Sequence, residues 1–211
     1  MINDTQVLNN GYPMPKVGLG VYKMEDNEME TAVQTALETG YRAFDTAYFY
    51  GNEQALGKAL NNSDIVREDV FITSKLWNDY QGYDSTIQYF NQSLENLGLE
   101  YLDLFLIHWP CENDQLYIES YKALEHLYEE GKIKAIGVCN FKIHHLEKLM
   151  KETKITPQVN QIELHPYFNQ QDVQDFCDEH DIKVTAWMPL MRNKGLLDDP
   201  VTVSYTHLRA H

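Results

Sequence analysis

An acid, an amine and an imidazole end three successive predicted strands in this 211-residue chain, and a phenol lies in the loop after the first of them: Asp45, Lys75, His108 and Tyr50. Asp45 and Tyr50 lie in GYRAFDTAYFYGNE, Lys75 ends VFITSK, and His108 ends LDLFLIH. A phenol has an unperturbed pKa of about 10, and a neighbouring ammonium lowers it. This set of residue types therefore favours general acid catalysis at a carbonyl oxygen.

In this interpretation Tyr50 donates a proton, His108 orients the carbonyl, and Asp45 balances the charge of a buried Lys75. None of these side chains supplies a hydride, so carbonyl reduction implies a nicotinamide cofactor. Taken alone, each residue has an ordinary structural explanation: the acid as a helix cap, the amine as a solvated strand end, and the imidazole as a hydrogen-bonding group. Their recurrence at successive strand ends favours a shared site.

The elements that must position these residues alternate regularly along the chain. Strands alternating with helices of 10–15 residues indicate βαβ units and a parallel sheet. Seven units in one register favour a (β/α)8 TIM barrel, an α/β fold whose strands all end on the face that carries the site. The predicted strands are 17–21, 41–45, 70–75, 102–108, 133–140, 158–163 and 182–187.

The length suggests that this barrel is incomplete. A complete barrel usually needs about 250 residues, and the predicted pattern stops after the seventh strand. We therefore expect the eighth βα unit and the C-terminal loop to be missing. At the other end, Asn10-Gly11 lies between residues 6–9 and 14–17 and predicts an N-terminal β-hairpin.

Later strand ends add two amides and an indole. Asn140 and Gln161 are predicted to hold a nicotinamide carboxamide, with Trp187 lying flat against the ring. Trp187 as an ordinary core residue is an almost equally good interpretation. Three aromatic side chains are candidates for the substrate pocket, although each could be ordinary packing: Tyr22, Trp77 and Trp109.

The overall charge and the cysteines limit the class of protein. Lys and Arg number 17 against 32 Asp and Glu, a formal net charge of −15, which argues against a nucleic-acid partner. Three cysteines without a CxxC pair fit a reducing cytoplasm. The N-terminus has no apolar signal segment, and the longest apolar run, residues 104–107, is too short to cross a bilayer. We expect a cytoplasmic protein without a membrane partner.

Other kinds of site find little support. The GLG at residues 18–20 resembles part of a dinucleotide fingerprint, but Lys23 stands where the third glycine belongs. His144-His145 lacks metal-ligand spacing, so no metal is expected. Cys111 near the end of the fourth predicted strand could pair with an imidazole as a nucleophile, but the Pro before it and its loop setting favour a pocket wall.

Six motifs in order, GYRAFDTAYFYGNE, ITSKLW, LDLFLIHWP, IGVCNF, NQIELHP and AWMPL, resemble those of the aldo-keto reductase family. The sequence is most like the bacterial diketogluconate and methylglyoxal reductases. The resemblance covers residues 11–200, so we expect one partial barrel domain over 1–200 and a non-matching tail over 201–211. It implies a monomer that reduces small aldehydes or ketones with NADPH, using Asp45, Tyr50, Lys75 and His108.

The chain departs from the family pattern at several cofactor positions. Met188 replaces a serine that meets the pyrophosphate, so Met188 and Leu190 are expected to contribute backbone contacts. Cys139 replaces a serine before Asn140. In the family, the eighth unit carries the groups that hold the adenosine 2′-phosphate, so without it NADPH binding is expected to be weak. Arg192 lies near the cofactor side, but it is more simply a solvated loop residue than a phosphate contact.

Two further expectations concern the end of the chain and the rival function. Asp199-Pro200 is a helix-start signal, but the β-branched residues 201–206 predict a non-helical tail. A cofactor-binding regulatory or redox-sensing subunit of the same fold is the alternative to an enzyme. The complete set of four reactive side chains favours the enzyme.

Overall fold

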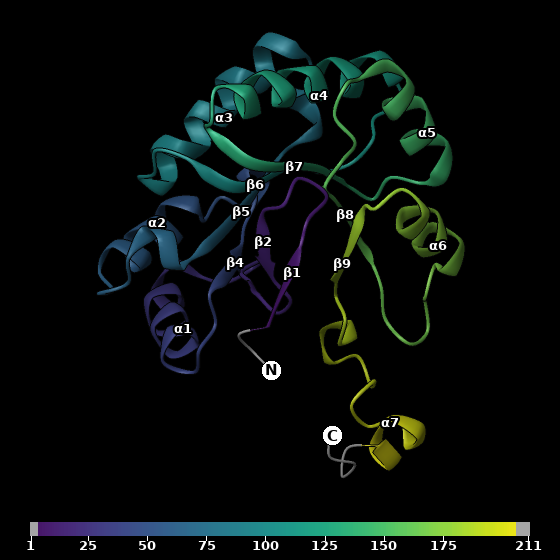
Figure 1. Cartoon of the computed structure of the whole chain (residues 1–211). Coiled ribbons are helices and arrows are strands. Elements are labelled where there is room, and N and C mark those ends of the chain that lie inside the picture. Colours follow the sequence, from purple (N-terminus) through teal and green to yellow (C-terminus); the bar gives the residue numbers. More distant parts are fainter. Residues whose placement is uncertain (1–3, 206–211) are drawn as a thin grey trace.

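The computed structural model describes residues 4–205. Seven parallel strands form one curled sheet in the order β3-β4-β5-β6-β7-β8-β9, with helices α1 to α6 on its outer face (Figure 1). The strands are β3 Leu19–Gly20, β4 Ala43–Asp45, β5 Phe71–Leu76, β6 Leu102–Ile107, β7 Ile133–Cys139, β8 Val159–Glu163 and β9 Lys183–Trp187. The helices are α1 Asp26–Glu38, α2 Glu53–Asn61, α3 Tyr83–Leu97, α4 Asp114–Glu129, α5 Ile143–Glu152 and α6 Gln171–Glu179.

The central strands show why the apolar runs of the sequence fold in this way. Every residue of β5 and β6 is buried, because the helices cover the outside of the sheet while the inside packs on itself. Parallel strands covered on both faces read as nearly continuous apolar runs. The predicted α/β fold, an incomplete barrel with seven parallel strands, is thereby confirmed.

The two ends of the sheet remain unpaired on one side. β3 and β9 each have a single neighbour, and residues 4–205 contain no eighth parallel strand. All five residues of β9 are half-buried, unlike those of β5 and β6. The open edge explains why β9 packs less completely than the central strands.

The chain after β9 corrects one prediction. Residues 200–205 form a short helix, α7 Pro200–Tyr205, and not the predicted non-helical stretch. Asp199 accepts hydrogen bonds at Oδ1 from the N–H groups of Val201 (2.9 Å) and Thr202 (3.1 Å). This N-cap and the proline at the first helical position outweigh the weak helix propensity of β-branched residues. Residues 206–211 lie outside the described part of the chain.

The predicted N-terminal hairpin is also confirmed, with antiparallel strands β1 Thr5–Val7 and β2 Pro13–Pro15 (Figure 1). It is tied to the barrel through the buried carboxylate of Asp103, in β6. Tyr12 donates its hydroxyl to Asp103 Oδ1 at 2.6 Å, and Arg67 donates to Oδ2 at 2.7 Å. The N–H of Ile72 donates to the same Oδ2 at 2.8 Å. One carboxylate thus joins the hairpin, β5 and β6.

Asp103→Asn should therefore destabilise the protein clearly. The variant keeps the shape but leaves the Arg67 guanidinium without its counter-ion, and Arg67 is only 20% exposed. We expect the free energy of unfolding to fall by about 2–4 kcal/mol, somewhat less than for a fully buried pair. Urea denaturation measures this loss. The exposed Asp64 provides a control, because Asp64→Asn should change stability by less than about 0.5 kcal/mol. Equal small effects in both variants would contradict the role of Asp103.

Candidate active site

Four side chains meet at the carboxyl ends of neighbouring strands. Lys75, in β5, forms an ion pair with Asp45 at the end of β4. Its ammonium Nζ also donates to the backbone oxygen of Thr46 at 2.9 Å and lies 3.4 Å from the hydroxyl of Tyr50. The Tyr50 ring, in the 3-10 helix Tyr48–Tyr50, lies edge to face with the ring of His108 at 5.6 Å. The residues that the sequence placed at successive strand ends are thus brought to one rim.

Burial and charge compete at Lys75 and Tyr50. Burial is the largest single effect on the pKa of the fully buried Lys75 and lowers it, but the contributions that raise it, led by the Asp45 carboxylate and followed by Tyr50, together outweigh burial, so the net pKa lies above its usual value. For Tyr50, burial raises the pKa and outweighs the opposing effect of the Lys75 charge. The Lys75 ammonium does lower the pKa of Tyr50 as expected, but this effect is smaller than the effect of burial. At neutral pH the site therefore holds a charged amine beside a protonated phenol.

His108 is a neutral imidazole in this site. Burial, with a smaller contribution from the Lys75 charge, lowers the pKa of His108 to about 3. Its Nδ1 is buried and has no hydrogen-bond partner among the described residues. A neutral imidazole still has one N–H donor. His108 is therefore suited to donating a hydrogen bond to a carbonyl oxygen without protonating it.

The depressed pKa of His108 predicts a pH dependence of stability. The unfolded chain binds a proton at His108 near pH 6.5, whereas the folded chain does so only near pH 3. Stability from the neutral imidazole is thus complete above about pH 6.5 and is lost as the pH falls, at up to about 1.4 kcal/mol per pH unit. Urea denaturation between pH 7 and 5 should show a shallower slope in His108→Gln than in the unmodified chain. Equal slopes in the two proteins would contradict the prediction.

The two predicted amides and the indole reach the same rim. Trp187, at the end of β9, donates its Nε1–H to Asn140 Oδ1 at 2.8 Å. Asn140 in turn donates from Nδ2 to the backbone oxygen of His108 at 3.0 Å. Gln161, in β8, donates to Asp45 Oδ2 at 2.8 Å. The amides therefore lie between the indole and the four reactive side chains.

These residues remain the predicted contacts for the nicotinamide end of a dinucleotide. A carboxamide needs both a donor and an acceptor, and side-chain amides offer both. Asn140 has a backbone φ of +63°, a conformation that is uncommon for a residue other than glycine and that clusters at functional sites. Met188 has a φ of +57° and is half-buried, whereas the Leu190 side chain is 57% exposed. Their roles as cofactor contacts stay predictions.

The three aromatic residues predicted to line the substrate pocket differ in how closely they approach the reactive side chains. The Tyr22 ring lies 4.7 Å from the ring of Tyr50, and the Trp77 ring lies edge to face with His108 at 5.2 Å. Trp109 follows His108 directly and is 41% exposed. Tyr22 and Trp77 therefore contact the reactive side chains themselves, and Trp109 lies beside one of them in the chain.

Phe49 belongs with these aromatic residues and is absent from the sequence-based prediction. Its ring stacks on Trp77 with centroids 3.8 Å apart and planes 16° apart, and the side chain is 51% exposed. Its neighbour Tyr48 instead packs with Tyr80 and Tyr89 on the side of α3. The aromatic run YFY was the available signal, but alternation alone does not tell which of the three rings faces the rim.

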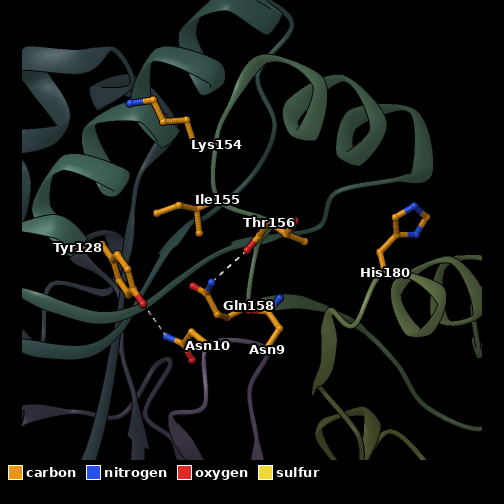
Figure 2. A pocket seen from close by; sticks show the side chains of 8 residues that line it. All are labelled: Asn9, Asn10, Tyr128, Lys154, Ile155, Thr156, Gln158 and His180. Carbon is orange, nitrogen blue, oxygen red and sulfur yellow. Dashed lines mark hydrogen bonds between the residues drawn. The ribbon is translucent and has the colours of Figure 1, made fainter.

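A depression of about 430 Å³ lies at the opposite, amino end of the strands (Figure 2). Its polar groups are largely bound to one another or to the backbone: Asn10 donates to the Tyr128 hydroxyl and the Lys134 carbonyl, and Gln158 donates to the Thr156 carbonyl. The lining residues are Asn9, Asn10, Tyr128, Lys154, Ile155, Thr156, Gln158 and His180. This depression lies between the hairpin and the barrel, and none of the four reactive side chains lines it.

The described residues contain no group of three or more His, Cys, Asp or Glu side chains arranged to hold a metal ion. Over residues 4–205, none of the helices has the length and hydrophobicity needed to cross a membrane.

The sequence and the fold match known proteins closely. The profile of the Aldo/keto reductase family matches residues 16–209, and the chain belongs to this family. A glyoxal reductase of Bacillus subtilis (strain 168) is 49% identical over 201 residues, covering 95% of this chain and 72% of the relative. Methylglyoxal reductase DkgA of Escherichia coli (strain K12) is 46% identical over 203 residues, covering 95% and 73%. The crystal structure of a Gox0644 variant in complex with NADPH is 40% identical with a TM-score of 0.90, covering 99% and 76%.

Proposed function

We propose that this chain reduces aldehyde and ketone carbonyls to alcohols with NADPH. The observation that carries the proposal is the placement of a charged, fully buried Lys75 3.4 Å from the hydroxyl of a protonated Tyr50, beside a neutral His108. The family and the NADPH complex of a relative with a TM-score of 0.90 support the choice of cofactor. A bound nicotinamide supplies the hydride to the carbonyl carbon.

The roles of the chain's own residues follow from charge and geometry. Tyr50 donates its proton to the carbonyl oxygen as negative charge develops there. The Lys75 ammonium stabilises the phenolate that remains, and Asp45 keeps Lys75 charged despite its burial. His108 donates a hydrogen bond to the same oxygen and orients it. Asn140 and Gln161 would hold the carboxamide of a bound nicotinamide, and Trp187 would lie against its ring.

We further propose that the substrates are small aldehydes and that the protein is a cytoplasmic monomer without a nucleic-acid partner. The names of two relatives, a glyoxal reductase and a methylglyoxal reductase, support small dicarbonyl substrates. The wall of Tyr22, Trp77 and Trp109 would enclose such a molecule beside His108. The net charge of −15 supports the absence of a nucleic-acid partner. The free cysteines among the described residues support a cytoplasmic location.

An assay of NADPH oxidation with glyoxal and methylglyoxal tests the proposal. The expected result is saturable oxidation at 340 nm with one alcohol formed per NADPH consumed, measured by chromatography of the product. The rival function, a cofactor-binding regulatory subunit, predicts a rise in melting temperature with NADPH but no alcohol. NADPH binding without alcohol formation would therefore overturn the proposed reductase activity and favour the regulatory subunit.

A further inference from the structure

Asn52 follows the loop of Tyr50 and immediately precedes α2, and its side chain is buried. An asparagine at this N-cap position ordinarily accepts a hydrogen bond from the first N–H groups of the helix. Within the described chain the Asn52 side chain makes no such bond. Both ends of its amide are used elsewhere, which indicates a role other than capping.

The oxygen of the amide holds the loop after β4. Asn52 Oδ1 accepts a hydrogen bond from the Thr46 hydroxyl at 2.8 Å. The backbone oxygen of the same Thr46 is an acceptor for the Lys75 ammonium at 2.9 Å. Thr46 also follows Asp45, the counter-ion of Lys75. A shift of this short segment would therefore move two of the groups that fix the ammonium.

The nitrogen of the amide holds the segment after β3. Asn52 Nδ2 donates to the backbone oxygen of Val21 at 2.8 Å, and the next residue is Tyr22, whose ring packs against Tyr50 at 4.7 Å. The N–H of Val21 donates in turn to the backbone oxygen of Asp45 at 3.0 Å. One buried amide thus connects two loops, one of which contacts Lys75 and the other Tyr50.

We propose that Asn52 is a positioning residue for carbonyl reduction, because its amide fixes Thr46 and Val21 and thereby the distance between the Lys75 ammonium and the Tyr50 hydroxyl. This inference rests on the proposed function, in which Tyr50 is the acid. Among the described residues, the Asn52 side chain bonds to Thr46 and Val21 and to none of the four reactive side chains. Its effect passes through the Thr46 carbonyl and the Tyr22 ring.

The inference predicts a change at Tyr50 that is measurable without turnover. Burial raises the pKa of Tyr50, the Lys75 charge lowers it, and the Asp45 charge raises it by less. If the ammonium moves away, the pKa of Tyr50 rises further. The kcat of the assay should fall about 10- to 100-fold, because small displacements of reacting groups are costly, while the KM for NADPH stays within about threefold.

The experiment compares Asn52→Leu, which has a similar shape without hydrogen bonds, with Asn62→Leu. Asn62 is the matched control, since it is exposed at the other end of α2 and donates only to Glu30 among the described side chains. Tyrosine labelled with carbon-13 at Cζ reports each phenol, and Tyr50→Phe assigns the Tyr50 signal among the 14 tyrosines. The Tyr50 pKa should rise by at least about half a unit in Asn52→Leu and stay unchanged in Asn62→Leu.

Thr46→Val removes the hydroxyl that donates to Asn52 Oδ1 and should raise the Tyr50 pKa by a smaller amount. This variant decides the question if circular dichroism shows that Asn52→Leu does not fold. A lower melting temperature with an unchanged Tyr50 pKa and unchanged kcat would overturn the inference, because that is the signature of a merely structural residue. A raised Tyr50 pKa in a chain without any turnover would support the inference while the proposed function fails.

Discussion

Tyr50→Phe is expected to lower the kcat for carbonyl reduction by about 100- to 10,000-fold, the usual contribution of a positioned proton donor. Phenylalanine keeps the ring against Tyr22 and His108 and removes only the hydroxyl beside the Lys75 ammonium. NADPH binding should stay within about threefold, since the predicted cofactor contacts lie on or after β7, β8 and β9. Pre-steady-state mixing of the NADPH complex with glyoxal measures the chemical step directly.

The control for this change is Tyr83→Phe, because Tyr83 is exposed on α3 and its ring contact is with His126. It should leave the rate unchanged. A loss of less than threefold in Tyr50→Phe would remove Tyr50 as the acid.

Lys75→Met should reduce kcat by about 100- to 1,000-fold, with only a modest effect on stability. The phenolate left after proton transfer loses its neighbouring positive charge, so the pKa of Tyr50 rises above its already raised value. Asp45 is not stranded, because its side chain is 26% exposed and still accepts a hydrogen bond from Gln161. Removing the desolvated ammonium also relieves a cost, so the free energy of unfolding should change by less than about 2 kcal/mol.

The condition of measurement follows from the raised pKa of Lys75. A lysine whose folded pKa exceeds its unfolded value of about 10.4 contributes its ion-pair stability fully below that value and loses it as the pH rises further. Assays at pH 7–8 therefore see the intact pair. Lys122→Met, which breaks the exposed pair with Glu119, is the matched control and should change stability by less than about 0.5 kcal/mol and leave kcat unchanged. A large loss of stability with normal kcat in Lys75→Met would contradict the catalytic role.

The sequence predicted the barrel because its strands are buried on both faces and separated by helices of regular length. β5 and β6 could be recognised from their apolar runs, and a parallel barrel brings their carboxyl ends to one rim. That topology alone allowed Asp45, Lys75 and His108 to be grouped before any coordinates were known. The strand predicted over residues 17–21 is longer than the observed edge strand β3, because only Leu19–Gly20 pair with a neighbour.

What the sequence did not predict depends on tertiary contacts and on the backbone. The Thr46 oxygen that accepts from Lys75 is a main-chain atom, which residue type cannot indicate. The net direction of the Tyr50 pKa depends on how deeply the phenol is buried, and that follows from the packing of the Tyr22 loop. The helix α7 was missed because a local cap by Asp199 outweighs propensity. The stacking of Phe49 on Trp77 joins two separate loops.

The most direct test of carbonyl reduction at this rim is the transfer of deuterium from NADPH labelled at C4 of the nicotinamide ring to the product alcohol. Mass spectrometry of the alcohol formed from glyoxal should show one deuterium per molecule with the unmodified chain, and the amount of labelled alcohol should fall at least about 100-fold with Tyr50→Phe. Alcohol without deuterium, or equal amounts of labelled alcohol from both proteins, would contradict hydride transfer assisted by Tyr50.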